Sequence, residues 1–244
     1  ASWRLKPTPF GARPRSLHST HVSAAVTIAA QQETNDVASR FALLSNKHVT
    51  EWLRFLGEYV MALWKFETPL FLAELIKEIS KEMSLTLAVE IPHTQQREVE
   101  QFVQTKQACP SFFTTPLPDG RNSLAVLNFL KSLDATKIKV HCMDIEFTEP
   151  VVQQDREQRL AESVLALQGP MVVIVGSFHA STCSYEKIIP MAKIIKNTKS
   201  VYSLYLEPTS GFFYNFGIKP VSSLSKKGKE FNQIIDLGAV SPAW

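Results

Sequence analysis

The clearest pattern in the chain is a run of apolar residues without polar alternation, Met-Val-Val-Ile-Val, which ends at Gly176. A short β-branched run of this kind predicts a strand that is covered on both faces, as in an α/β sheet. Similar runs at 85–91 and 138–145 predict two more buried strands, and residues 52–59 predict an earlier one. Each of these last three strands ends close to an acidic residue.

Helical patterns alternate with the strands. Thr68-Pro69 is a typical helix start, and an apolar stripe follows as far as Ile79, with charged residues on the opposite side. The order strand, helix, strand over 52–91 predicts a βαβ unit with parallel strands and a right-handed crossover. Further helices are expected at about 33–44, 94–107, 122–134, 153–168 and 184–197, and further strands at 200–206 and 234–237. The sequence therefore predicts an α/β fold with a mixed, mainly parallel β-sheet flanked by helices.

The distribution of charge divides the chain into two parts. Residues 1–32 hold four arginine or lysine residues and no acidic residue, whereas the remainder holds 22 basic and 23 acidic residues. The first part is also rich in Ser, Thr, Pro and Gly, which favours a poorly ordered arm up to about residue 20. We expect residues 1–32 to be a basic leader, either a secretion signal or an organelle transit segment, and residues 33–244 to form a single domain.

Composition also excludes several classes of function. The domain is almost neutral, which argues against a nucleic-acid partner, and no apolar run is long enough for a membrane span. The three cysteines are widely spaced without a C-x-x-C pair, so we expect a reducing compartment and no cysteine-based zinc site. The sequence contains no G-x-G-x-x-G, P-loop, G-x-S-x-G or H-E-x-x-H motif, and therefore lacks the common signatures of nucleotide binding, serine hydrolysis and zinc peptidases.

Candidate chemistry gathers at the predicted strand ends. Glu58, Glu90, Asp144 and His179 each lie at or just beyond the end of a strand. Ligands of open α/β sheets bind at the carboxyl ends of the strands, so we expect these side chains to line one crevice. A histidine there can take a proton from water, while a nearby carboxylate fixes its tautomer. Arg156 and Arg159, on the helix before the His179 strand, could neutralise the carboxylates or bind an anionic substrate.

Other assignments stay open at this point. His93 either joins the site as a base, caps the helix that it begins or faces solvent. His48, which lies before the first strand, is a further candidate for the base. Asp144 also fits an ordinary turn residue. Cys183 follows His179 by four positions, so a Cys–His pair is a further alternative.

Several fragments together resemble one known superfamily. Leu56-Gly57-Glu58 resembles the first-strand motif of the erythromycin esterase/ChaN-like (EreA/ChaN-like) superfamily, and residues 88–96 resemble its second-strand glutamate and glutamine-rich helix start. Residues 156–161 are similar to its R-[DE]-x-x-M-A helix. Residues 176–180 match its G-x-x-H-A signature, and residues 231–242 resemble its final strand. The likeness covers about residues 52–243.

The resemblance implies an EreA/ChaN-like fold and a metal-independent, esterase-like hydrolase site. The candidate catalytic residues carried over are Glu58, Glu90, Arg156, His179 and His93. One position departs from the family pattern, because Val60 stands where the G-E-x-H motif has its histidine. The expected mechanism must therefore take its base from another histidine.

The leader and the domain together look like a type III secreted effector of plant pathogens within this group. The resemblance then implies a protein secreted by a bacterium into the host cytoplasm, where it provokes cell death through a host protein or small-molecule substrate. Two alternatives come from other classes: a haem-binding protein of the ChaN type, and a non-enzymatic module recognised by a host receptor. The sequence has no C-x-x-C-H motif or clear axial ligand pair, so we expect no cofactor, with haem as the alternative.

Overall fold

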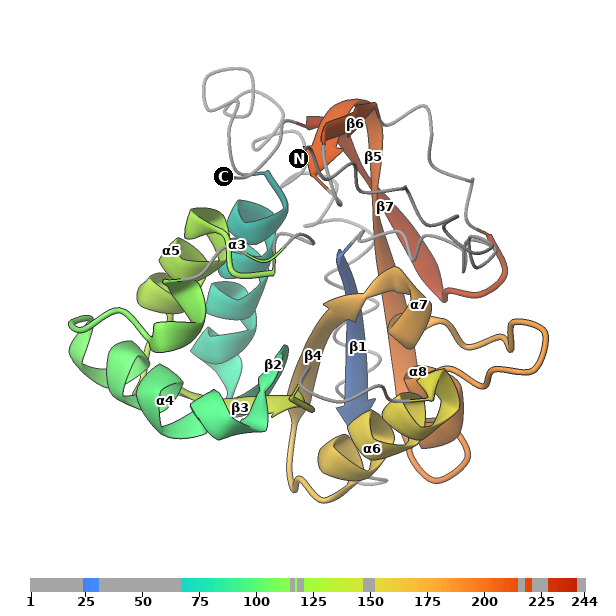
Figure 1. Ribbon diagram of the computed structural model, residues 1–244, viewed down its shortest axis with the longest axis horizontal. Helices are drawn as coiled ribbons and strands as arrows, with labels where there is room; N and C mark the ends of the chain where they lie inside the picture. The colour runs from blue at the N-terminus through green and yellow to red at the C-terminus, as the bar shows by residue number, and fades with distance from the viewer. Residues whose placement is uncertain are drawn as a thin grey trace, which may run out of the picture.

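The structure is a computed structural model that describes residues 24–30, 67–114, 117, 121–146, 152–214, 218–220 and 228–240. In this part of the chain a mixed sheet has helices on both of its faces (Figure 1). The strands are β1 (Ala24–Ala30), β2 (Leu85–Pro92), β3 (Ile138–Asp144), β4 (Met171–Gly176), β5 (Ser200–Tyr214), β6 (Ile218–Pro220) and β7 (Gln233–Val240). The mixed α/β class with a parallel-strand sheet is confirmed.

The strand order is β3-β2-β4-β1-β5-β6, and β7 also pairs with β5. The parallel part is the group β3-β2-β4, in which β2 pairs in parallel with both neighbours. β1 is antiparallel to β4 and to β5, whereas β7 runs parallel to β5. The carboxyl ends of three adjacent strands, β2, β3 and β4, therefore meet at one edge.

The helices form two layers, one on each face of the sheet. They are α3 (Glu67–Glu82), α4 (Gln96–Thr105), α5 (Leu124–Ser132), α6 (Gln153–Leu165), α7 (Ser177–Ala180) and α8 (Met191–Ile195), with short 3₁₀ turns η2 (His93–Gln95) and η3 (Ser111–Phe113). In Figure 1, α3, α4 and α5 lie together on one side, and α6, α7 and α8 lie on the other. None of the helices in the described ranges is both long and apolar enough to cross a bilayer.

Two hydrophobic cores explain why the central strands lack polar alternation. Leu87 and Val172 pack with the α3, α4 and α5 side chains, while Val173 packs with Leu160 and Val164 of α6 on the opposite face. Successive strand residues point to opposite faces, so a strand with a core on both sides must be apolar at nearly every position. The apolar runs that predicted β2 and β4 follow from this arrangement.

Among the described residues, the Gln96 side chain bonds to two backbone groups at the outer edge of β3. The side-chain amide of Gln96, at the start of α4, donates from Nε2 to the Val140 carbonyl (2.8 Å). Its Oε1 atom accepts from the Cys142 N–H (2.7 Å). The same Nε2 also donates to the Glu100 carboxylate (2.7 Å). Gln96 thus satisfies one backbone donor and one backbone acceptor in the way a neighbouring strand would.

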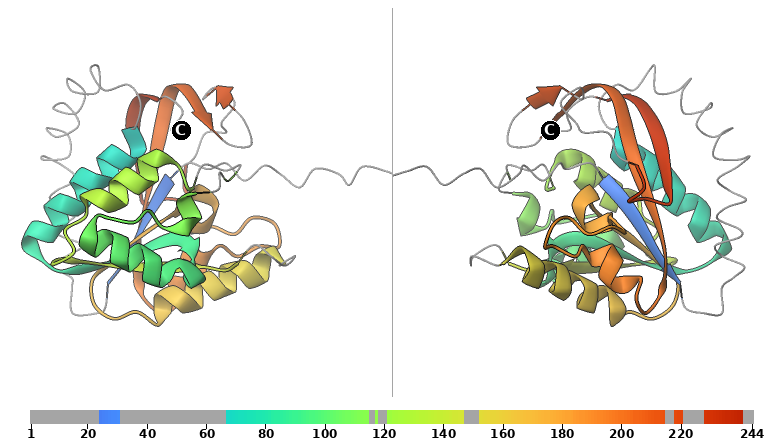
Figure 2. Two further views of the ribbon diagram at one scale, coloured as in Figure 1. Left: turned by 60° about the vertical axis from the view of Figure 1, so that its left-hand side comes forward. Right: turned by 90° about the vertical axis from the view of Figure 1, so that its right-hand side faces the viewer.

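The largest correction to the sequence analysis concerns β1. Residues 24–30 were expected within the leader, but they form a strand between β4 and β5, visible beside β5 in Figure 2. The segment reads Ala-Ala-Val-Thr-Ile-Ala-Ala, and alanine has low strand propensity. Its place in the sheet comes from long-range pairing with the two neighbouring strands, which no local pattern reveals.

Two further predicted elements differ in extent. The helix expected at 184–197 is confined to Met191–Ile195, because Tyr185 and Ile188 form a bridge and Pro190 precedes the helix. The strand expected at 200–206 continues to Tyr214, where its second half pairs with β6 and β7. The predicted helix at 33–44 and strand at 52–59 lie outside the described residues. With them lie His48, Glu58 and Val60.

Candidate active site

The parallel strands bring the candidate residues to one edge of the sheet. Glu90 lies near the end of β2, Asp144 ends β3, and His179 lies in α7 directly after β4. Glu90 follows Ala88 by two positions, so its side chain is on the face covered by α6. That helix supplies Arg156 and Glu157 to the same cluster.

Arg156 binds both carboxylates. Its Nη2 atom donates to Glu90 Oε1 (2.7 Å) and to Asp144 Oδ2 (2.8 Å), and its Nε atom donates to Asp144 Oδ1 (3.2 Å). The contact with Asp144 is bidentate, which is the strong geometry for a guanidinium and a carboxylate. Arg156, on α6, therefore links the ends of β2 and β3.

A second guanidinium completes the bridge. Arg121 Nη1 lies 2.8 Å from Asp144 Oδ2 and 3.2 Å from Glu90 Oε1. The Asp144 side chain is fully buried, while the side chains of Glu90, Arg121 and Arg156 are 12%, 15% and 16% exposed. Among these four salt-bridged side chains, only Glu90, Arg121 and Arg156 reach solvent, so an incoming molecule contacts them first.

His179 is held by a buried carboxylate. Its Nδ1 atom lies 2.8 Å from Glu157 Oε1 and 2.9 Å from Oε2. Glu157 also accepts from the Met191 N–H (2.9 Å) and from Gln153 Nε2 (2.5 Å), so its orientation is fixed by three donors. On the other side of the ring, Nε2 lies 3.2 Å from Arg156 Nη1 and 3.6 Å from Glu90 Oε1.

The hydrogen bond between Arg156 and His179 requires one particular tautomer of the His179 ring. A guanidinium only donates, so Nε2 accepts from Arg156 only when it carries no proton. The ring proton is then on Nδ1 and is donated to Glu157. A buried carboxylate that holds Nδ1–H leaves Nε2 as the basic nitrogen, which is the arrangement of a histidine general base.

The electrostatics keep both bridging groups charged. Burial raises the pKa of Glu90, but the charge that His179 carries when protonated, the charges of Arg121 and Arg156 and the Gly176 N–H outweigh it and lower this pKa to about 2. Burial lowers the pKa of Arg156, and the Glu90 and Asp144 carboxylates more than compensate, so the pKa is raised. Glu90 is therefore a carboxylate at neutral pH, which suits charge stabilisation and excludes a role as proton donor.

Three of the five candidate catalytic residues come together, Glu90, Arg156 and His179, and Asp144, the other strand-end residue of the described part, joins them. His93 is exposed, and its Nδ1 atom contacts the backbone oxygen of Asp144 (3.2 Å), beside the cluster. Glu58 lies outside the described residues. The Cys183 thiol is exposed and lies 3.8 Å from the Lys229 carbonyl, whereas both ring nitrogens of His179 contact other groups.

Sequence reasoning missed two members of the cluster and undervalued a third. Asp144 also fitted an ordinary turn residue, yet it is the buried acceptor for two guanidiniums. Glu157 directly follows Arg156 and lies one helical turn after Gln153, a spacing that does hint at a shared face. Arg121 lies in a loop between η3 and α5, and no periodic pattern marks it.

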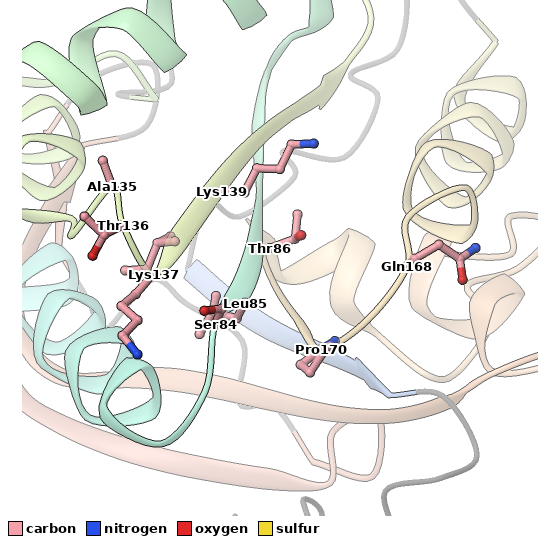
Figure 3. Close-up of a pocket in the computed structure, with 10 residues that line it drawn as sticks. Ser84, Leu85, Thr86, Ala135, Thr136, Lys137, Lys139, Gln168 and Pro170 are labelled. Atoms are coloured by element: carbon pink, nitrogen blue, oxygen red, sulfur yellow. The ribbon is translucent and has the colours of Figure 1, made fainter.

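A separate pocket of about 270 Å³ lies at the opposite end of the parallel strands, where they begin. It is lined by residues before or at the start of β2, β3 and β4, and Figure 3 shows Thr86, Lys139 and Gln168 around it. The pocket and the charged cluster at the carboxyl ends of the strands are therefore two separate sites. In the described ranges, no group of three or more His, Cys, Asp and Glu residues is arranged to hold a metal ion.

Comparison of the chain with protein-family models, with curated proteins and with solved structures gives no match. The function must therefore be argued from the chain's own residues.

Proposed function

We propose that the cluster at the carboxyl edge is a hydrolase site in which His179 acts as the general base on water. The observation that carries the proposal is the Glu157–His179 contact, which leaves Nε2 directed at the two bridging groups Arg156 and Glu90. The strand-end position and the esterase-like sequence motifs support the same function.

The proposed mechanism assigns a separate role to each group. Water takes the place of the Arg156 Nη1 contact on Nε2, which Arg156 can give up because its bidentate contact with Asp144 remains. His179 accepts a proton from this water as the water oxygen bonds to the ester carbonyl carbon, and Glu157 stabilises the imidazolium that forms. The imidazolium then donates the proton to the departing alkoxide as the ester C–O bond breaks. The guanidiniums of Arg121 and Arg156 stabilise the negative charge that develops on the substrate oxygen.

The test is hydrolysis of p-nitrophenyl butyrate by the full chain and by the variants His179→Gln and Glu157→Gln. We expect His179→Gln to lower kcat by about 10²-fold to 10⁴-fold, the usual contribution of a general base. Glu157→Gln should lower kcat and change its dependence on pH, because the amide no longer holds the ring proton of His179 on Nδ1. Arg159→Gln is the matched control, since Arg159 is exposed on the same helix. Equal rates for wild type and His179→Gln, with unchanged melting curves, would contradict the proposal.

We also propose the cellular setting that the sequence motifs imply, a bacterial type III effector that acts in the cytoplasm of plant host cells. The basic, acid-free composition of residues 1–23, which precede β1, supports it. Expression of the full chain in leaf tissue should cause cell death, and His179→Gln should abolish this response at equal protein level. Cell death that persists in the variant would separate the effector role from hydrolysis.

One observation favours a second candidate, a non-enzymatic module that a host receptor recognises by its surface. The side chains of Glu90, Asp144, Arg121 and Arg156 are all paired and at most 16% exposed. Such a network also suits a scaffold. In that case exposed substitutions would change the host response, whereas His179→Gln would leave it intact.

A further inference from the structure

A second pair of reactive side chains lies on the α6 face of the sheet, away from the candidate active site. His141 of β3 places its Nε2 atom 2.8 Å from the hydroxyl oxygen of Ser163 in α6. Both side chains are half-buried. Ser163 follows Arg156 by seven residues, which is about 10 Å along the helix. The proposed hydrolase mechanism uses neither residue.

The Ser163 hydroxyl behaves differently from other hydroxyls in the helices. Ser80, Thr105 and Ser132 each donate to a backbone carbonyl of their own helix, three or four residues earlier, at 2.7–2.8 Å. This local bond is the usual partner of a serine or threonine inside a helix. Ser163 instead has a ring nitrogen within hydrogen-bond distance, as a nucleophile has its base.

The surroundings of His141 suit it to accept a proton. Burial lowers the pKa of the ring, the charge of Lys139 lowers it further, and Glu100 opposes this in part. The net direction is downward, so the ring is mostly neutral at pH 7. A neutral ring that accepts from Ser163 can take the hydroxyl proton during attack on a carbonyl carbon.

A pocket shares strand β3 with this pair, although neither His141 nor Ser163 lines it. Lys139 is on the same face of β3 as His141, two residues away, which is about 7 Å. It lines the pocket of about 270 Å³ together with Thr86 and Gln168, and Figure 3 shows these three side chains around one space. The lining includes Lys137 and Lys139 and no acidic residue, so its charge favours an anionic group.

We propose that Ser163 and His141 form a second catalytic pair that transfers an acyl group from esters bearing an anionic substituent, which Lys139 binds. In the first step the Ser163 Oγ–carbonyl carbon bond forms and the ester C–O bond breaks. The serine proton passes to His141 Nε2 and from there to the departing alkoxide, which leaves as an alcohol. Water then gives a proton to His141 Nε2 while its oxygen bonds to the acyl carbon. The Ser163 Oγ–carbon bond breaks, the carboxylic acid is released, and His141 returns that proton to Ser163 Oγ.

The test uses the full chain and two activated esters, p-nitrophenyl hemisuccinate, which is anionic, and p-nitrophenyl acetate, which is neutral. Peptide mass spectrometry should find the succinyl group on Ser163, and Ser163→Ala should abolish it. His141→Gln keeps a hydrogen-bonding group and should slow acylation about 100-fold. Lys139→Met should slow acylation by the hemisuccinate about fivefold, with little effect on the acetate.

Two controls separate this site from background reaction and from the first site. Ser132→Ala removes a serine whose hydroxyl bonds its own helix, so it should leave acylation unchanged. His179→Gln should also leave acylation of Ser163 unchanged, because that residue belongs to the other cluster. An unmodified Ser163, or a modification whose rate is indifferent to His141→Gln in a folded variant, would overturn the inference.

Discussion

Removal of the Glu90 charge should weaken the fold in a way that depends on pH. The pKa of this carboxyl falls from 4.5 to about 2 on folding. Its side chain is only 12% exposed, so solvent screens the charge little. Such a difference corresponds to at most about 3 kcal/mol of folding free energy at neutral pH, where the group is ionised in both states, because a neutral His179 ring does not contribute its charge.

The sign of the effect follows from the lowered pKa. A group whose pKa is lowered by folding stabilises the native state fully above its unfolded value, near pH 4.5, and loses this contribution as the pH falls toward 2. Glu90→Gln should therefore cost up to about 3 kcal/mol at pH 7, equivalent to a fall in Tm of up to about 6–12 °C for a chain of this size. At pH 3 the cost should be less than half as large, because wild type then loses part of the same contribution.

Urea-induced unfolding followed by circular dichroism at pH 7, 4.5 and 3 measures this difference. Glu162→Gln is the matched control, because Glu162 is exposed on α6 and should change stability by no more than about 0.5 kcal/mol. A Glu90→Gln variant as stable as wild type at pH 7 would refute the electrostatic argument. A cost that stays constant from pH 7 to pH 3 would refute it as well.

Three further outcomes are expected. Lys199→Met should lower stability by about 1 kcal/mol in urea unfolding, since Lys199 Nζ donates to the Leu165 and Leu167 carbonyls at the end of α6; Lys196→Met, at an exposed position nearby, should not. Leu87→Ala should cost about 2–5 kcal/mol by the same assay, because Leu87 is fully buried in the core beneath α3, α4 and α5. Haemin added to the full chain should give no saturable Soret shift in an absorption titration, and a tight, stoichiometric shift would instead support the haem-binding alternative.

The strand ends were the most predictable part of the site. An apolar run that stops at a polar residue marks both the end of a buried strand and the edge where ligands bind, and Glu90, Asp144 and His179 were all found in this way. Arg156 was found because its helix carries a recognisable motif. Arg121 could not be predicted, because its position depends on the path of a loop. A loop has no sequence periodicity that indicates which way its side chains point.

The sheet itself shows the same limit. β2 and β4 were predicted because each is covered on both faces and therefore has no polar alternation. β1 escaped notice because its alanines do not favour a strand and its position depends on β4 and β5, which come more than 140 residues later in the chain. Pairing across such a separation is decided by the folded sheet and leaves little trace in the local sequence.

The amide of Gln96 on the outer margin of β3 has a consequence for self-association. An open strand is a template on which a second molecule can add its own strand, and repeated addition leads to fibrous aggregates. By holding Val140 and Cys142, one glutamine keeps this template closed in the part of the sheet that the structure describes. A Gln96→Leu chain should therefore remain folded in dilute solution but associate through β3 as its concentration rises, so this side chain contributes to solubility as well as to stability.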